Sequence, residues 1–180
     1  MEIIQTGIKD LILLQPKVFK DPRGYFFESY NKEKFKDLGV DIDFTQDNQS
    51  LSAKGILRGL HFQKPPHAQG KLVRVIKGAV LDVAVDIRKN SPTYGKHFMA
   101  ELTESNFTMM YIPAGFAHGF LTLEDETIFS YKCTDTYHPE TEGGLLWNDP
   151  DLNIQWPIED PIMSDKDQVF SPFNVFASPF

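Results

Sequence analysis

Residues 57–63, LRGLHFQ, and residues 69–75, QGKLVRV, have the outline of a strand hairpin in a small β-barrel. Successive side chains of a strand point to opposite faces of its sheet. His61 therefore lies on the face opposite its apolar neighbours Leu60 and Phe62. Residues 57–63 thus form a strand with one apolar face and an opposite face that carries a histidine.

In a regular strand the Arg58 side chain would point to the face opposite His61, because an odd number of positions separates the two residues. A bend at Gly59 would bring both side chains to one cavity. On the second strand, Lys71 shares a face with the two valines that follow it. A strand-end lysine is usually solvated and a lone histidine is usually structural. Only their combination on one hairpin makes them candidates for a site.

The period of two continues in residues 81–88, LDVAVDIR, which predicts a half-buried strand. Gly78 marks the turn before it. Residues 90–95 and 112–116 contain further Pro and Gly turn signals. Strands at such short intervals are typical of all-β sandwiches and barrels. We therefore predict an all-β jelly-roll barrel with short peripheral helices.

Two segments lie outside this pattern. Asn31 is a candidate cap for a short helix over residues 32–38, with Gly39 ending it. The proline-rich tail from Trp156 predicts irregular structure. No repeat or linker divides the chain, so we expect residues 1–180 to form one domain.

Composition limits the classes of partner. The chain has 180 residues, including 15 Phe, 6 Tyr and 2 Trp, which can supply a sizeable core. A formal net charge of −7 argues against general binding to nucleic acid or to anionic membranes. Cys133 is the only cysteine and cannot form an internal disulfide. We find no signal-peptide pattern and no apolar run of transmembrane length, so we expect a cytoplasmic protein.

Residues 111–120, YIPAGFAHGF, contain Pro-x-Gly-x-x-His, in which Pro and Gly shape a turn that returns His118 to the barrel interior. Such a histidine either contacts a ligand or only orients a neighbour. Tyr131 and Tyr137 follow, and most tyrosines simply pack the ring and hydrogen-bond the hydroxyl. Asp167, taken alone, is a solvated loop acid.

Together these segments form a pattern that a known family shares. In chain order the shared residues are Asp21-Pro22-Arg23-Gly24-Tyr25-Phe26-Phe27-Glu28, Gln46-Asp47-Asn48, Arg58-Gly59-Leu60-His61, Lys71-Leu72-Val73-Arg74-Val75, Pro113-x-Gly115-x-x-His118-Gly119-Phe120, Tyr131-Lys132-x-x-Asp135 and Ser164-x-Lys166-Asp167. The chain closely resembles the dTDP-4-dehydrorhamnose 3,5-epimerases, metal-free cupins of dTDP-L-rhamnose synthesis. The resemblance runs from about Thr6 to Asp167, and the Phe-rich tail, residues 170–180, has no counterpart.

Metal-binding cupins usually hold their ion through a His-x-His pair and a nearby Glu on one hairpin, completed by a His on a later strand. Here the first hairpin offers only His61, and Lys71 stands where an anionic ligand is expected. A hard or borderline divalent cation therefore lacks donors. We expect no metal in this reaction and no other cofactor.

By the resemblance, His61 is the general base and Asp167 the carboxylate that orients it. A proton on C3 or C5 of a 4-keto sugar is acidic because the C4 carbonyl takes up the charge as an enolate. Lys71, with Arg58 as a second candidate, would stabilise the oxyanion that develops at O4. Inversion also needs a proton from the opposite face. Tyr131 matches the family's acid, and Tyr137 is a nearby alternative.

The resemblance also implies residues that hold the nucleotide sugar: Arg23 and Arg58 at the pyrophosphate, Glu28, Gln46 and Asn48 at the thymine and sugar, Phe19 or Phe26 stacked on the base, and His118 and Tyr137 in the same pocket. In this family the N-terminal segment crosses to a partner subunit. Phe19, Arg23 and Glu28 are thus expected in the neighbour's pocket of a homodimer.

Three alternatives remain open. The first is an epimerase that inverts only C3 or only C5 of a related dTDP-4-keto-deoxysugar, although Tyr131 favours double inversion. The second is a sugar-nucleotide ketoisomerase on the same scaffold, which the pairing of His61 with Asp167 disfavours. The third is a non-catalytic nucleotide-sugar-binding protein, which would need the arginines but not the acid–base groups.

Overall fold

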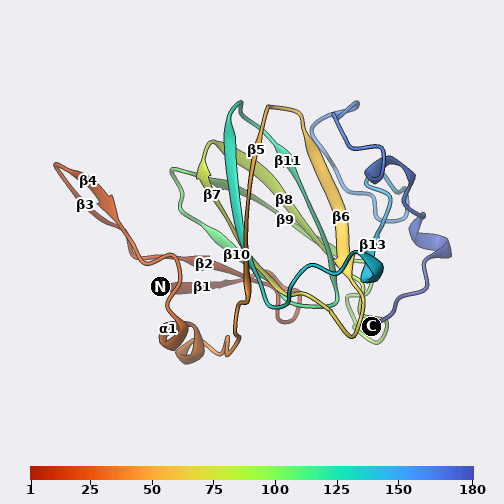
Figure 1. The fold of residues 1–180 in the computed structure, drawn as a ribbon, viewed down its shortest axis with the longest axis horizontal. Coiled ribbons are helices and arrows are strands. Elements are labelled where there is room, and N and C mark those ends of the chain that lie inside the picture. The colour runs from red at the N-terminus through yellow and green to blue at the C-terminus, as the bar shows by residue number, and fades with distance from the viewer.

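The structure is a computed structural model that describes residues 1–180. Two antiparallel sheets pack face to face (Figure 1). One sheet contains, in spatial order, β1 (Glu2–Gln5), β2 (Ile12–Gln15), β10 (Met109–Ile112), β7 (Lys71–Lys77), β12 (Thr127–Cys133) and β5 (Gln46–Ser52). The other contains β13 (Glu142–Gly144), β6 (Leu57–Gln63), β11 (Phe116–Thr122), β8 (Ala79–Asp86) and β9 (His97–Thr103). The predicted all-β jelly-roll barrel is confirmed.

The space between the two sheets is filled by a core of interleaved apolar side chains. Val73 and Val75 of β7, Ala84 of β8 and two stacked rings, Phe120 and Phe129, belong to this cluster. The two valines share their face of β7 with Lys71, as the alternation predicted. That lysine therefore faces the barrel interior.

The strand predicted at residues 81–88 is not half-buried, and this expectation is wrong. Val83, Val85 and Ile87, on the outer face, are all 0% exposed. They pack in a second cluster against partly buried aromatic side chains of the C-terminal tail: Trp156, Phe173, Phe176 and Phe180. Figure 1 shows this tail, in blue, lying outside the sheet beside β6 and β13. The alternation assigned the opposite face to solvent, but Asp82, Ala84 and Asp86 on that face are also 0% exposed. Both faces of the strand are therefore buried.

The tail itself is irregular, as expected, apart from short 3₁₀ turns. These turns are η2 (Asp167–Val169) and η3 (Phe173–Val175), and a third, η1 (Pro139–Thr141), precedes β13. The tail is also joined to the barrel through its backbone, because the Leu57 N–H donates to the Ile162 carbonyl at 3.0 Å. The segment that leads to Asp167 is thus fixed beside the start of β6.

The predicted helix is present as α1 (Lys32–Asp37), one residue shorter than expected. The Asn31 side chain accepts a hydrogen bond from the Lys34 N–H, which is the contact of an N-cap. Phe35, only 1% exposed, anchors the helix in a third apolar cluster on the outer face of the six-stranded sheet. No helix in the structure combines the length and apolar character needed to span a membrane.

Strand β6 contains the irregularity that positions the site. Opposite β11, His61 pairs with His118 but Arg58 pairs with Phe120, so β6 has one extra residue between these pairs. This is a β-bulge, and it turns Arg58 and His61 toward the same side. Gly59 lies in it with φ +133°, and a Cβ added there would be 2.5 Å from the Gly119 Cα. Only glycine fits this position.

A small hairpin of β3 (Phe19–Asp21) and β4 (Gly24–Phe26) projects from the barrel near the N-terminus (Figure 1). Every residue of these two strands is exposed. The exposed side chains include Phe19 at 55%, Tyr25 at 56% and Phe26 at 66%. Three large aromatic side chains on one short exposed hairpin form an apolar surface that a monomer leaves uncovered.

Candidate active site

A cavity of about 390 Å³ opens between the two sheets and is bounded by the segment that leads to Asp167. Six residues predicted from the sequence line it: Arg58, His61, Lys71, His118, Tyr131 and Asp167. An adjoining cavity of about 240 Å³ shares His61, Lys71 and Tyr131 with the first. Three further predicted residues line this second cavity: Gln46, Asn48 and Tyr137. The fold thus gathers nine of the predicted side chains, the six and the three, around one continuous region.

His61 and Asp167 form a short, shielded pair. The His61 Nε2 lies 2.6 Å from an Asp167 carboxylate oxygen, and the two side chains are 26% and 3% exposed. The other carboxylate oxygen accepts the Gly59 N–H at 3.3 Å. Burial alone would raise the pKa of Asp167, but the hydrogen bonds from His61 and Gly59 and the charge of Lys166 lower it below its usual value. Asp167 therefore stays ionised and holds the His61 ring in place.

His118 forms a second histidine–carboxylate pair in the same cavity. Its Nε2 lies 3.0 Å from both carboxylate oxygens of Asp82, which is 0% exposed. Burial lowers the pKa of His118, and the positive charges of Lys71 and His61 lower it further, while Asp82 opposes the shift. The Pro-x-Gly-x-x-His turn does return this side chain to the interior, as predicted. Asp82, which fixes its orientation, was not predicted.

Lys71 lies in an environment where removal from water, rather than any neighbouring charge, favours loss of its proton. Burial lowers the pKa of Lys71 below its usual value, although nearby acidic groups, including Asp82 and Glu142, oppose the shift. Its wall of the cavity belongs to the six-stranded sheet, whereas His61 lies on the five-stranded sheet. The expectation that these two strands form one hairpin is therefore wrong, and they face each other across the cavity instead. A half-buried ammonium group that faces a cavity is well placed to stabilise an anionic oxygen.

The two tyrosines differ in environment. Tyr131 is on β12, and its backbone pairs with Asn48 on one side and Val73 on the other. Burial raises the pKa of Tyr131, with the charge of Arg58 opposing, so the phenol remains protonated at neutral pH. Tyr137 is 52% exposed, and its hydroxyl donates to Glu142 at 3.0 Å. Only Tyr131 lines both cavities.

Three further residues in or beside the cavities were given no role from the sequence. Ser50 lines the first cavity, and its buried hydroxyl oxygen has no hydrogen-bond partner. Ser52 accepts hydrogen bonds from the Arg58 guanidinium at 3.2 and 3.4 Å. Both serines follow Gln46 and Asn48 at intervals of two along β5, so strand alternation was the signal that could have identified them. Lys166 pairs with Glu142 at 2.8 Å across the mouth of the site.

Three predicted substrate-binding residues lie away from these cavities. Phe19 and Arg23 are on the projecting hairpin, around a separate shallow pocket that also includes Phe26. Glu28 accepts a hydrogen bond from the Asn31 side chain at 3.1 Å and forms an ion pair with Lys34. Within one chain the structure does not bring these residues to His61.

The barrel and its cavity define an enzyme of acid–base type, with a histidine–aspartate pair on one wall and a tyrosine and a lysine on the other. The sequence profile described as dTDP-4-dehydrorhamnose 3,5-epimerase matches residues 5–174. The chain therefore belongs to the dTDP-4-dehydrorhamnose 3,5-epimerase family and is an epimerase, an enzyme of the isomerase class. The jelly-roll fold and the epimerase function that the sequence motifs implied are therefore confirmed.

Individual comparisons agree with this assignment. A dTDP-4-dehydrorhamnose 3,5-epimerase of Methanothermobacter thermautotrophicus is 51% identical over 95% of this chain and 94% of its own length. A Legionella pneumophila dTDP-6-deoxy-D-glucose-3,5-epimerase, solved in complex with dTDP-4-keto-L-rhamnose, is 45% identical, with a TM-score of 0.93 over 98% of this chain and 94% of that chain. A dTDP-4-dehydrorhamnose 3-epimerase of Streptomyces niveus is 37% identical over 93% of this chain and 82% of its own length.

The environment of Lys71 predicts an unusual effect on stability. A basic group whose pKa is lower in the folded than in the unfolded protein reduces the free energy of unfolding. This reduction is largest at pH values below the folded-state pKa. It disappears as pH rises toward the ordinary lysine value of 10.5. Lys71→Met should therefore raise the urea midpoint at pH 7.5, and the gain should shrink as pH approaches 10.5. Lys77→Met, at an exposed lysine paired with Glu126, should change stability by less than about 0.5 kcal/mol. A lower midpoint for Lys71→Met at pH 7.5 would contradict this prediction.

Proposed function

We propose that this chain inverts C3 and C5 of dTDP-4-dehydro-6-deoxy-D-glucose to give dTDP-4-dehydro-L-rhamnose, a step of dTDP-L-rhamnose synthesis. The observation that carries the proposal is the cavity in which the His61–Asp167 pair faces Tyr131 and Lys71. The family assignment supports the substrate class. The buried, unpaired Cys133 suits the reducing cytoplasm, where we place the reaction.

In this proposal His61 removes the proton from the carbon beside the C4 carbonyl. Asp167 fixes the His61 ring and stabilises the imidazolium that forms, because its own pKa is lowered and it remains an anion. The electron pair moves onto O4, where the Lys71 ammonium group stabilises the enolate. Arg58 is available for the pyrophosphate, and Ser52 orients its guanidinium.

Inversion requires that a proton leave one face of the sugar and arrive on the other. His61 lies on β6 of the five-stranded sheet, and Tyr131 lies on β12 of the opposing six-stranded sheet. A sugar held between the two sheets therefore meets the base on one side and the phenol on the other. The raised pKa of Tyr131 keeps its proton available for donation at neutral pH. After each inversion His61 must lose a proton to water and Tyr131 must regain one from water, and the same two groups can then act at the other carbon.

The remaining cavity residues would hold the rest of the substrate. Gln46, Asn48 and Tyr137 line the adjoining cavity, and His118 lines the first, where Asp82 holds its ring. We propose that all four contact the bound nucleotide sugar. Inversion of C3 alone is the alternative, because the Streptomyces niveus relative is a 3-epimerase, but its identity of 37% is below the 51% of the Methanothermobacter relative.

The first test of this proposal removes the base and its partner separately. His61→Ala should slow deuterium exchange at both C3 and C5 by about 10²–10⁴-fold, because both steps use the same base. Asp167→Asn should slow both exchanges while the fold is retained, since the imidazolium loses its carboxylate. His97→Ala, on β9 and outside both cavities, should match wild type. Near-wild-type exchange in His61→Ala would show that the base lies elsewhere.

The second test separates proton removal from inversion. Tyr131→Phe keeps His61 and Lys71, so it should still form the enolate, but a phenyl ring has no proton to donate. Deuterium should enter with retained configuration at C5, while formation of the L-configured product falls steeply. Tyr137→Phe should have a small effect on both. If exchange and inversion fall together in Tyr131→Phe, or if Tyr137→Phe shows the predicted pattern instead, Tyr131 is not the acid.

We also propose that the chain is a homodimer in which each projecting hairpin enters the neighbour's site. Exposed Phe19 and Phe26 give the hairpin an apolar surface to bury, and Arg23 and Glu28 are then supplied from the partner rather than from the same chain. This arrangement explains why residues expected at the nucleotide lie away from the cavity of their own chain.

Complementation tests the exchange of hairpins. Arg23→Ala and His61→Ala should each lose activity alone. Coexpressed with different tags, they should form mixed dimers that contain one intact site of two. Isolated mixed dimers should therefore have about half of wild-type activity, and the unseparated mixture about a quarter. Recovery requires that Arg23 serve the neighbouring site. No recovery despite isolated mixed dimers, or a monomer at assay concentration, would refute the proposed arrangement.

A further inference from the structure

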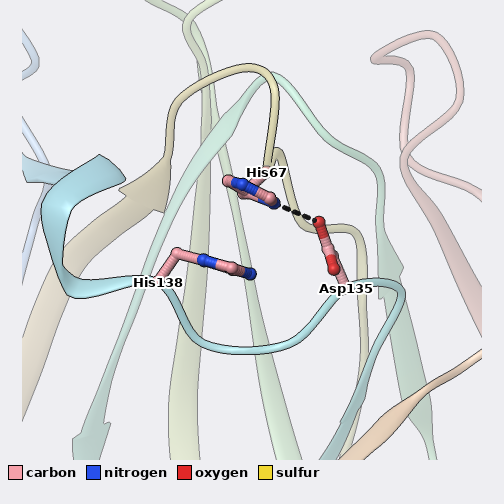
Figure 2. Close-up of side chains that lie close together, drawn as sticks. All are labelled: His67, Asp135 and His138. Atoms are coloured by element: carbon pink, nitrogen blue, oxygen red, sulfur yellow. Dashed lines mark hydrogen bonds and ion pairs between the residues drawn. The ribbon is translucent and has the colours of Figure 1, made fainter.

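A second cluster of potential ligands lies outside the catalytic cavity. His67 is in the loop between β6 and β7, and Asp135 and His138 are in the loop that follows β12 (Figure 2). One donor atom from each of the three lies within 4.8 Å of the others. All three side chains are half-buried. They form the one group of this kind in the structure.

The geometry within the cluster brings donors together from two loops. The His67 Nδ1 lies 3.1 Å from an Asp135 carboxylate oxygen. The rings of His67 and His138 are stacked, with centroids 3.5 Å apart and planes inclined by 10° (Figure 2). The other Asp135 carboxylate oxygen accepts the Thr136 N–H at 2.8 Å, which fixes the orientation of the carboxylate.

The backbone beneath these side chains is held by two glutamines. The buried Gln63 side chain donates to the His67 carbonyl at 2.8 Å and accepts the His138 N–H at 2.7 Å. Gln69 donates to the Asp135 carbonyl at 2.7 Å. All three candidate ligands are thus anchored to one network before any ion arrives, which reduces the entropic cost of assembling a site.

We propose that His67, Asp135 and His138 bind one divalent transition-metal ion of the Zn²⁺ class. Two imidazoles and a carboxylate are a common donor set for Zn²⁺ and for Co²⁺. Bonds of about 2.0–2.1 Å to each donor require the donor atoms to approach to about 3.3 Å of one another. One imidazole must also rotate about its Cβ–Cγ bond, because an imidazole coordinates in its own plane. That torsion is soft.

A neighbouring carboxylate completes the arrangement. The His138 Nδ1 lies 3.1 Å from Glu140, so an Nδ1–H donated to that carboxylate directs the lone pair to Nε2. That atom lies 3.2 Å from the Thr136 hydroxyl, a contact that the ion would replace. Outer carboxylates that orient a metal-binding histidine in this way are a general feature of metal sites. Water would fill the remaining positions.

The consequence is a link between two loops rather than a step of the reaction. The ion would join the loop of residues 64–70 to that of residues 134–138, which includes Tyr137 at the edge of the second cavity. None of the three ligands lines the first cavity, where His61 and Lys71 act. The inference therefore does not depend on the proposed chemistry, and it leaves the expectation of metal-free epimerisation intact.

Calorimetric titration of the full-length, tag-free, chelator-treated protein with Zn²⁺ tests the proposal. One ion should bind per chain, and Co²⁺ should produce a visible absorption band. At a Zn²⁺ concentration 100 times Kd the melting temperature should rise by about 5 °C or more. His67→Gln, His138→Gln and Asp135→Asn should each weaken binding at least about 10-fold. Epimerisation by the wild type should be the same with and without chelator.

His97→Gln is the matched control, because His97 is on β9 and outside the cluster, and it should bind Zn²⁺ as wild type does. Epimerase activity of each variant without metal shows that it is folded. The proposal is overturned if Zn²⁺ binding is absent or not saturable, or if the three cluster variants bind as wild type. It is also overturned if His61→Asn, rather than the cluster variants, removes binding, because the ion then lies in the catalytic cavity.

Discussion

The β-bulge at Gly59 is the constraint on which the site depends. Regular alternation would place Arg58 and His61 on opposite faces of β6, and the extra residue brings both to the cavity. The bulge also presents the Gly59 N–H to Asp167, the residue that holds His61. Close contact with Gly119 on β11 leaves no room for a Cβ. One backbone irregularity therefore positions the proposed base, its carboxylate partner and a proposed phosphate ligand.

The two sheets then divide the chemistry between opposite walls. The His61–Asp167 and His118–Asp82 pairs reach the cavity from the five-stranded sheet and the tail, whereas Lys71 and Tyr131 come from the six-stranded sheet. Burial shifts the pKa values of Lys71 and Tyr131 in opposite directions, lowering the first and raising the second. Both shifts favour the neutral group, which is the general effect of moving a charge out of water. A jelly roll thus offers acid–base groups on both sides of one ligand.

Local patterns in the sequence were sufficient for most of the barrel. Period-two alternation predicted that Lys71 shares a face with Val73 and Val75, the Asn31 cap predicted α1, and the Pro-x-Gly-x-x-His turn predicted the inward His118. Long-range contacts were not predictable in this way. The outer face of β8 is buried by a tail about ninety residues later in the chain, and the His67, Asp135 and His138 cluster joins two distant loops. Asp167 was identified only through family resemblance, because nothing local distinguishes it from a solvated acid.

In the proposed reaction, one cavity exchanges and inverts two carbons of the same sugar. The most direct measurement is NMR analysis of the product formed by the wild-type protein from dTDP-4-dehydro-6-deoxy-D-glucose in deuterated water. We expect an L-configured 4-keto sugar with deuterium at both C3 and C5. Deuterium and inversion at only one of these carbons, or a product whose carbonyl has moved from C4, would contradict it.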